Sequence, residues 1–110
     1  MTFKGASVVM APDGDPTRHR ASIKTGKLEL TTVVVELMNF DQAVDVCKDL
    51  VQNQGVQSLT FCPGFTHEAI ARIRSAVGER VAINVARGDI PSNQVMGEIL
   101  AREGWIPEGP

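Results

Sequence analysis

The sequence predicts an α/β fold with a four-stranded, mostly parallel sheet and three or four helices, of the half-barrel or flavodoxin-like kind. Strand-like apolar stretches at Leu28–Met38, Val56–Phe61 and Val81–Ala86 are each followed by a turn and a segment with helical spacing. Strands that alternate with helices pair in parallel, because each crossover helix returns the chain to the same edge of the sheet. A chain with four Phe, one Trp and no Tyr must also build its core from aliphatic side chains. Open parallel sheets bind ligands at the carboxyl ends of their strands, so the pattern predicts where a site would lie.

The first strand is predicted at Ala6–Ala11, a short apolar run that Pro12 ends. The next segment, Asp13–Lys27, is polar and irregular. Within it, Asp15-Pro16 is typical of an N-cap followed by a first helical residue, and Gly26 is typical of a helix stop. We therefore expect a short helix on an exposed loop between the first two strands.

The second strand is indicated by Leu30–Val35, which holds two Thr and three consecutive Val. β-Branched side chains favour strands, and an unbroken apolar run predicts burial on both faces of the sheet. The helix that follows can be capped by Asn39 or Asp41 and is ended by Gly55. Its inward side is marked by apolar residues at helical spacing: Ala43, Val46, Cys47, Leu50 and Val51.

The third strand, Val56–Phe61, leads through a turn into a helix that Thr66 can cap. Phe65 and Ile70 lie at the spacing of a hydrophobic staple around this cap, and Gly78 ends the helix. This unit has the clearest helix-start and helix-stop residues of the chain.

The fourth strand, Val81–Ala86, is followed by Arg87–Asp89, and Pro91 then opens the last helix. The apolar residues expected to face inward along this helix are Val95, Met96, Ile99 and Leu100. We expect the tail after Gly104 to be loosely held unless Trp105 docks on the core or on a neighbouring molecule.

Several short motifs occur together over residues 6–87: Asp15-Pro16 with His19-Arg20, then Thr25-Gly26, the Val-rich second strand, and a Gly64-Phe65 turn after the third. On these motifs the chain resembles an uncharacterised family of roughly hundred-residue α/β proteins, classed only as a domain of unknown function. The resemblance implies a compact β/α domain and carries no established reaction, so no catalytic residue follows from it.

Composition restricts the function classes. The length of 110 residues predicts a single domain. With a net charge of −2 and no Lys/Arg run, the chain lacks the positive surface that nucleic acids or anionic membranes would bind. No apolar run approaches the roughly 18 residues of a membrane span, and the N-terminus lacks the pattern of a signal peptide. Cys47 and Cys62 lie in different elements, so we expect no disulfide framework and a cytoplasmic location.

Cofactor motifs are missing from the sequence. Two His and two Cys at scattered spacing do not form a metal-binding set, and neither a Gly-x-Gly-x-x-Gly loop nor a Walker loop is present. We therefore expect no cofactor and no metal, and the sequence leaves open whether the protein is an enzyme.

The turn after the third strand is the first candidate site. Gly64 lets a ligand approach the backbone closely, Thr66 supplies a hydroxyl, and a helix start favours anions. Cys62 could act as a nucleophile if His67 or His19 served as its base. The alternative is that Pro-Gly only makes the turn, Thr66 only caps the helix, and the thiol is inert.

A second cluster of positive charge surrounds His19 and Arg20, after the first strand, and Arg87 follows the fourth. If the strands are parallel, these residues share the rim of the sheet with the turn at Cys62. Guanidinium groups there could hold a carboxylate or phosphate. The alternative is a solvated loop, since short charge clusters are usually only that.

Two function hypotheses follow. The first is an enzyme or binding protein for a small anionic metabolite at the carboxyl ends of the strands, with a site made by His19, Arg20, Cys62, Gly64, Thr66, His67 and Arg87. It requires these residues to converge. The second is a non-enzymatic homo-oligomeric assembly module, in which apolar faces and Trp105 form protein contacts. Under either hypothesis a small sheet leaves surface uncovered, so we expect a homo-oligomer.

Overall fold

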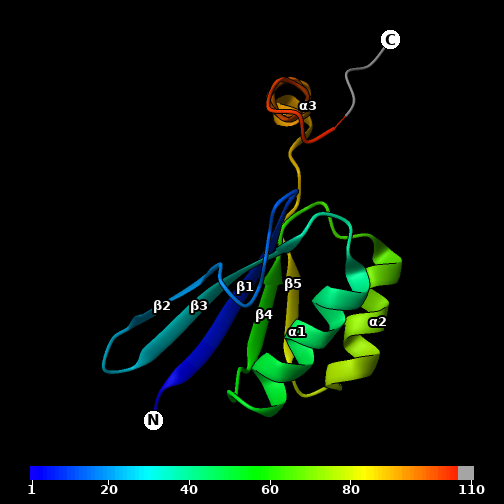
Figure 1. The fold of residues 1–110 in the computed structure, drawn as a ribbon. Helices are drawn as coiled ribbons and strands as arrows, with labels where there is room; N and C mark the ends of the chain where they lie inside the picture. The colour runs from blue at the N-terminus through cyan, green and yellow to red at the C-terminus, as the bar shows by residue number, and fades with distance from the viewer. Residues whose placement is uncertain (107–110) are drawn as a thin grey trace.

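The computed structural model describes residues 1–106, and Figure 1 shows an α/β fold with one mixed, mostly parallel sheet. In chain order the elements are β1 (Phe3–Ala11), β2 (Arg20–Lys24), β3 (Leu28–Glu36), α1 (Phe40–Gln52), β4 (Ser58–Phe61), α2 (His67–Val77), β5 (Ala82–Val85) and α3 (Ile90–Arg102). The predicted fold class is confirmed, with five strands rather than four.

The strands lie in the order β2-β3-β1-β4-β5, and every pair is parallel except β2 with β3. The chain therefore starts near the middle of the sheet, steps to one side, and then crosses back to the other. Counted among the parallel strands alone, this is the beginning of the flavodoxin-like order and not the consecutive order of a half-barrel. The direction reverses between β1 and β4, which makes the carboxyl ends of these two strands the switch point of the sheet.

The segment between the first two predicted strands differs from expectation. Asp15 does begin a single helical turn, in which its carbonyl accepts from the amides of Arg18 and His19. The chain then enters β2 instead of continuing as a helix, and it pairs with the outer edge of β3. The Thr25 hydroxyl closes the following hairpin by accepting from two backbone amides. The open backbone groups along the edge of β3 need partners, and β2 supplies them.

Both α1 and α2 cover the same face of the sheet and pack against each other (Figure 1). The reason is topological. Crossovers between parallel strands are right-handed, and the chain moves in one direction across the sheet from β3 to β4 and from β4 to β5. The connection from β1 to β3 moves the other way, so a helix there would have covered the second face. That connection contains β2 instead, and among residues 1–106 no helix lies on the second face.

The core lies between the sheet and the helices α1 and α2. Along β1 the inward residues Ala6, Val8 and Met10 are buried, as expected for a strand with one packed face. The predicted burial of the second strand on both faces is wrong, because Thr32 is exposed and Val34 only half-buried. The remaining core residues come from β3, α1, β4, α2 and the loops beside them: Val33, Val35, Ala43, Val46, Cys47, Leu50, Val56, Leu59, Phe61, Phe65, Ala69, Ile73 and Val81.

The last helix lies beyond the carboxyl ends of the strands, away from the layer formed by α1 and α2 (Figure 1). Its apolar residues do not face a core as predicted: no residue of the described helix α3 is buried, and Val95 is 55% exposed. The molecule is consequently 51 Å long against 29 and 28 Å across. Its radius of gyration is 14.8 Å, whereas a compact chain of this length has about 13 Å. Trp105 follows α3 and is 36% exposed, and residues 107–110 of the predicted tail lie outside the described residues.

Candidate functional site

The predicted site turn joins β4 to α2 and is built by packing and capping. The Thr66 hydroxyl accepts from the amide of Ala69 at 3.1 Å, so the predicted cap is confirmed. Phe65 is buried with its ring centroid 4.9 Å from that of Phe61. At Gly64 a Cβ would lie 2.7 Å from Cε of Met10, so glycine lets this turn lie against the sheet. These contacts account for the turn without a ligand, and anion binding there stays a prediction.

The two cysteines differ in environment. Cys47 is fully buried, as predicted for a small hydrophobic residue, and burial raises the pKa of its thiol to about 12. Cys62 is half-buried at the end of β4. Among the hydrogen bonds of residues 1–106, none joins the thiol of Cys62 to an imidazole, so the nucleophile–base pair has no geometric support in one chain.

A cavity of about 240 Å³ lies at the switch point between β1 and β4. It is lined by apolar side chains and by the thiol of the predicted site residue Cys62, and α3 closes one side: Val9, Met10, Leu37, Cys62, Pro63, Gly64, Met96, Leu100 and Trp105. This lining contains no Lys, Arg or His. The position at the strand ends agrees with the predicted location of a site, but the lining is not that of an anion-binding pocket.

The positive residues lie at opposite edges of the sheet. His19 precedes β2, where its Nδ1 accepts from the amide of Asp15 at 3.0 Å, and Arg20 donates from Nε to the carbonyl of Pro16 at 2.8 Å. Arg87 follows β5 and pairs with Asp89 at 3.0 Å. Four strand spacings of about 4.8 Å separate the two edges, roughly 19 Å in all.

The seven predicted site residues are therefore divided among three places. Four of them belong to the turn after β4: Cys62, Gly64, Thr66 and His67. His19 and Arg20 lie at the β2 edge, and Arg87 lies beyond β5. One chain does not bring them into a single pocket, and the convergence that the anion hypothesis requires is not formed within it.

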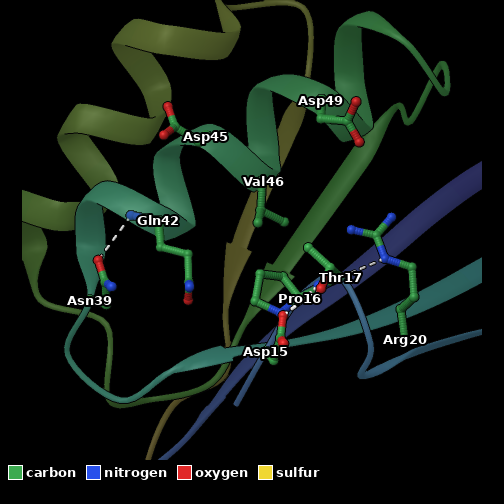
Figure 2. Close-up of a pocket in the computed structure, with 9 residues that line it drawn as sticks. All are labelled: Asp15, Pro16, Thr17, Arg20, Asn39, Gln42, Asp45, Val46 and Asp49. Atoms are coloured by element: carbon green, nitrogen blue, oxygen red, sulfur yellow. Dashed lines mark hydrogen bonds between the residues drawn. The ribbon is translucent and has the colours of Figure 1, made fainter. Parts of the chain in front are cut away.

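A shallow groove of about 510 Å³ separates the loop after β1 from α1, and Figure 2 shows the residues that line it. They are Asp15, Pro16, Thr17, Arg20, Asn39, Gln42, Asp45, Val46 and Asp49. Arg20 is the one predicted site residue among them, and it is outnumbered by carboxylates. The groove therefore carries net negative charge, whereas a site for a metabolite anion would be expected to carry positive charge.

Most of the groove's polar groups are already used by neighbours. The pKa of Asp15 is held below its usual value, chiefly because the Thr17 hydroxyl donates to its carboxylate. The Asp49 carboxylate accepts from the side chains of Asn53 and Gln54. Among the described residues no cluster of His, Cys, Asp and Glu could hold a metal ion. The groove is explained by local structure.

The face of the sheet opposite α1 and α2 is the uncovered surface that the sequence analysis expected of a small sheet but did not locate. Strand alternation and register place the following residues on it: Phe3, Gly5, Ser7, Val9, Ala11, Ala21, Ile23, Leu28, Leu30, Thr32, Val34, Glu36, Ser58, Thr60, Ala82 and Asn84. Of these positions in the described strands, only Glu36 is charged, and its carboxylate accepts from the Asn39 side chain at the rim. We call this surface the open face.

The other charged residues of these strands point to the side of the sheet that α1 and α2 cover. Arg20 lines the groove beside α1, Lys4 donates to a carbonyl near the end of α1, and Lys24 pairs with Glu29. A signal for the open face was present in the sequence, in the odd-numbered residues of β1 and the even-numbered residues of β3. It was missed because the unbroken valine run suggested helices on both sides.

Comparison with known proteins agrees with the resemblance inferred from the motifs. The model of a family of unknown function, DUF6506, matches residues 3–101, which extend from the start of β1 nearly to the end of α3. The chain belongs to the DUF6506 family. No curated protein and no solved structure matches it. Membership of DUF6506 assigns no ligand or reaction, so any functional inference must come from the surfaces described above. Within residues 1–106 of this DUF6506 protein, no helix is long and apolar enough to span a membrane.

Proposed function

We propose that this protein is a self-associating α/β module whose open face is covered by a second copy of the chain. The observation that carries the proposal is a five-stranded sheet face with no helix on it and no charged side chain in its interior. A sheet face that remains in water normally carries polar and charged residues, because exposed apolar area is unfavourable.

Large apolar side chains stand out from this face. Ile23 is 67% exposed and Phe3 is 52% exposed, and other partly exposed apolar residues lie on the same face: Leu28, Val9 and Val34. Full burial of one such side chain contributes roughly 1.5–3 kcal/mol. Five strands at about 4.8 Å spacing and about 20 Å mean height give the face roughly 500 Å².

The chemistry of the face favours a second copy as its occupant. Two-fold symmetry brings the same patch of each molecule together, so any charge in its centre would meet a like charge. The open face avoids that repulsion because its centre holds only apolar residues and the small polar residues Ser7, Thr32 and Thr60. A foreign partner is usually selected by opposite charges, which this face does not offer.

The hypothesis of a small anionic ligand has less support. Its seven residues lie in three places, the switch-point cavity is apolar, and the groove between the loop after β1 and α1 carries carboxylates. The anion hypothesis would regain support only if a second copy brought His19 or Arg87 to the turn at Cys62.

The proposal is tested by the oligomeric state of the full chain. Sedimentation at micromolar concentration should give twice the chain mass of 11.9 kDa. The variant Thr32→Glu places a charge at the centre of the open face and should sediment as a folded monomer. Ala71→Glu, at an exposed position on α2, is the matched control and should remain dimeric.

A wild-type monomer would overturn the proposal, and so would a Thr32→Glu variant that associates as strongly as the wild type. Far-UV circular dichroism of each variant establishes that its secondary structure is retained. Because Thr32 is exposed, its replacement leaves the core intact and the comparison stays interpretable.

A further inference from the structure

We propose that α3 is the element that covers the open face, and that it does so reciprocally, with the α3 of each copy lying on the sheet of the other. This inference rests on the proposed self-association and names the contact that produces it. Each chain lacks one helix layer and has one helix outside its own layers (Figure 1). Two copies together can satisfy both conditions.

α3 has little packing within its own chain. No residue of the described helix is buried, although more than half of its residues are apolar or small. Met96, Leu100 and the following Trp105 contact the rim of their own sheet around the switch-point cavity. This contact leaves Ile90 at 85% exposure and Val95 at 55%. A helix of 13 residues needs tertiary packing to be stable in water, because isolated helices of that length are marginal.

α3 lies outside the layers formed by the sheet, α1 and α2 (Figure 1). The helix extends past the carboxyl ends of the strands, which gives the molecule its 51 Å long axis. From that position the helix reaches only the rim of its own sheet, where it lines the switch-point cavity together with Val9, and it leaves the rest of its own open face uncovered. It can reach a neighbouring sheet without any change in its own chain, since it is already directed away from its core.

The connection before α3 agrees with this arrangement. Ala86 is the last residue tied to the sheet, and its amide donates to the carbonyl of Phe61 at 2.8 Å. Beyond it, Arg87 and Asp89 are exposed and pair with each other. Asp89 occupies the N-cap position but makes no side-chain cap bond to α3. The start of the helix is therefore held neither by a cap nor by its own core.

A stable dimer requires a certain buried area on each copy. A specific interface buries about 800 Å² on each partner. The open face supplies only roughly 500 Å² by the strand dimensions given above. A helix of about 20 Å length and about 10 Å diameter adds roughly 200 Å² of contact surface. Each α3 covers roughly 200 Å² of the partner's face, so the rest of the two faces must also meet for the contact to approach the required area. Two open faces stacked alone fall well below it.

The charged residues of α3 do not oppose a contact between its first turns and the open face. Within α3 the charged residues are Glu98 and Arg102, at the end of the helix away from Ile90. The start of the helix, up to Met96, carries polar and apolar side chains only. It can therefore lie against the uncharged centre of the open face without burying an unpaired charge.

Cysteine cross-linking between copies tests the arrangement in the full-length chain. In a Cys62→Ser background, where Cys47 stays buried, one preparation carries Val95→Cys on α3 and another carries Thr32→Cys on the open face. The two are mixed, unfolded and refolded together, oxidised, and separated on a non-reducing denaturing gel. The expected product is a covalent dimer that forms only in the mixture. Val95→Cys mixed with Ala71→Cys is the matched control and should give no covalent dimer.

The other outcomes refute either the α3 contact or the self-association. A covalent dimer formed by Thr32→Cys alone means that the two faces meet at Thr32, where the partner's α3 is proposed to lie. That result refutes the reciprocal α3 contact and leaves self-association intact. A chain carrying both substitutions that cross-links within itself means that α3 folds back on its own sheet, with the same consequence. A dimer by sedimentation without the mixed cross-link also refutes the α3 contact. A monomer by sedimentation refutes the self-association itself.

Discussion

Gly14 lies in the loop after β1, where the backbone passes close to the end of β3. A Cβ at this position would lie 2.2 Å from the carbonyl oxygen of Val35. That atom belongs to the backbone of an interior strand, so it cannot move aside as the end of a side chain could. The absence of a side chain at Gly14 therefore permits the crossing from β1 towards β2.

We predict that Gly14→Ala lowers the free energy of unfolding by about 2 kcal/mol or more, as expected when overpacking forces the backbone to shift. Gly26→Ala is the control, since a Cβ there meets no atom within 4 Å, and its effect should stay within about 0.5 kcal/mol. Urea unfolding of both variants measures the difference. Equal stabilities of the two variants would contradict the close approach at Gly14.

Cys47 gives a pH dependence with a definite sign. Burial raises the pKa of its thiol from 9.0 to about 12. The unfolded chain therefore releases this proton at a lower pH than the folded chain does. The stabilisation from a neutral buried thiol is complete below pH 9 and is lost as the pH rises from 9 towards 12.

We predict that between these limits the free energy of unfolding falls with a contribution of about 1.4 kcal/mol per pH unit from this thiol. The Cys47→Ala variant lacks the group and should show a shallower slope, whatever its stability at neutral pH. Urea unfolding at several alkaline pH values gives both slopes. Parallel slopes in the two proteins would show that Cys47 is not the buried group assumed.

Among the helices, α2 and α3 begin in different ways. The Thr66 hydroxyl accepts from an amide in the first turn of α2, whereas Asp89 bonds to Arg87 and leaves the start of α3 without a side-chain cap. This difference matches the packing of the two helices, because α2 contributes Ala69 and Ile73 to the core and α3 contributes nothing.

We predict that Thr66→Ala lowers the free energy of unfolding by about 1 kcal/mol, the usual loss when an N-cap is removed. Asp89→Ala removes no cap bond and only an exposed ion pair, whose contribution is about 0–1 kcal/mol, so it should have the smaller effect. Thermal or urea unfolding of the two variants provides the comparison. A larger loss for Asp89→Ala would contradict the assignment of the caps.

The elements that follow from local sequence could be predicted, and those that depend on distant contacts could not. The valine run of β3 and the caps of α1 and α2 are local signals, and the structure confirms those strands and helices. The strand β2 was missed because Arg20–Lys24 is polar, entirely exposed, and has only Ile23 as a strong strand former. It is a strand because β3 offers an unpaired edge, which no local pattern reveals.

The site residues show the same limit. Their position at the carboxyl ends of the strands follows from parallel pairing, but their separation depends on the order of strands across the sheet. His19 and Arg87 follow strands β1 and β5, and the insertion of β2 moves His19 to the far edge. The apolar spacing of α3 was recognised, yet the same spacing would suit packing on its own sheet, on a partner, or on neither.

At the scale of the whole molecule, self-association links stability to protein concentration. Any partner that binds only the folded chain raises the melting temperature by mass action. We predict that the melting temperature of the wild type rises with protein concentration, whereas that of Thr32→Glu does not. Differential scanning calorimetry over a wide concentration range measures both, with Ala71→Glu expected to follow the wild type. A wild-type melting temperature that is independent of concentration would contradict dimerisation.

Among residues 1–106 the last buried core residue is Val81, so the core is complete before α3 begins. During synthesis, the sheet and its two covering helices can therefore fold while α3 is still within the ribosome. Domains commonly fold in this way, from the N-terminus onward. The segment proposed to join two copies then emerges after the core residues, so that nascent chains on one messenger can complete their own cores before they bind one another.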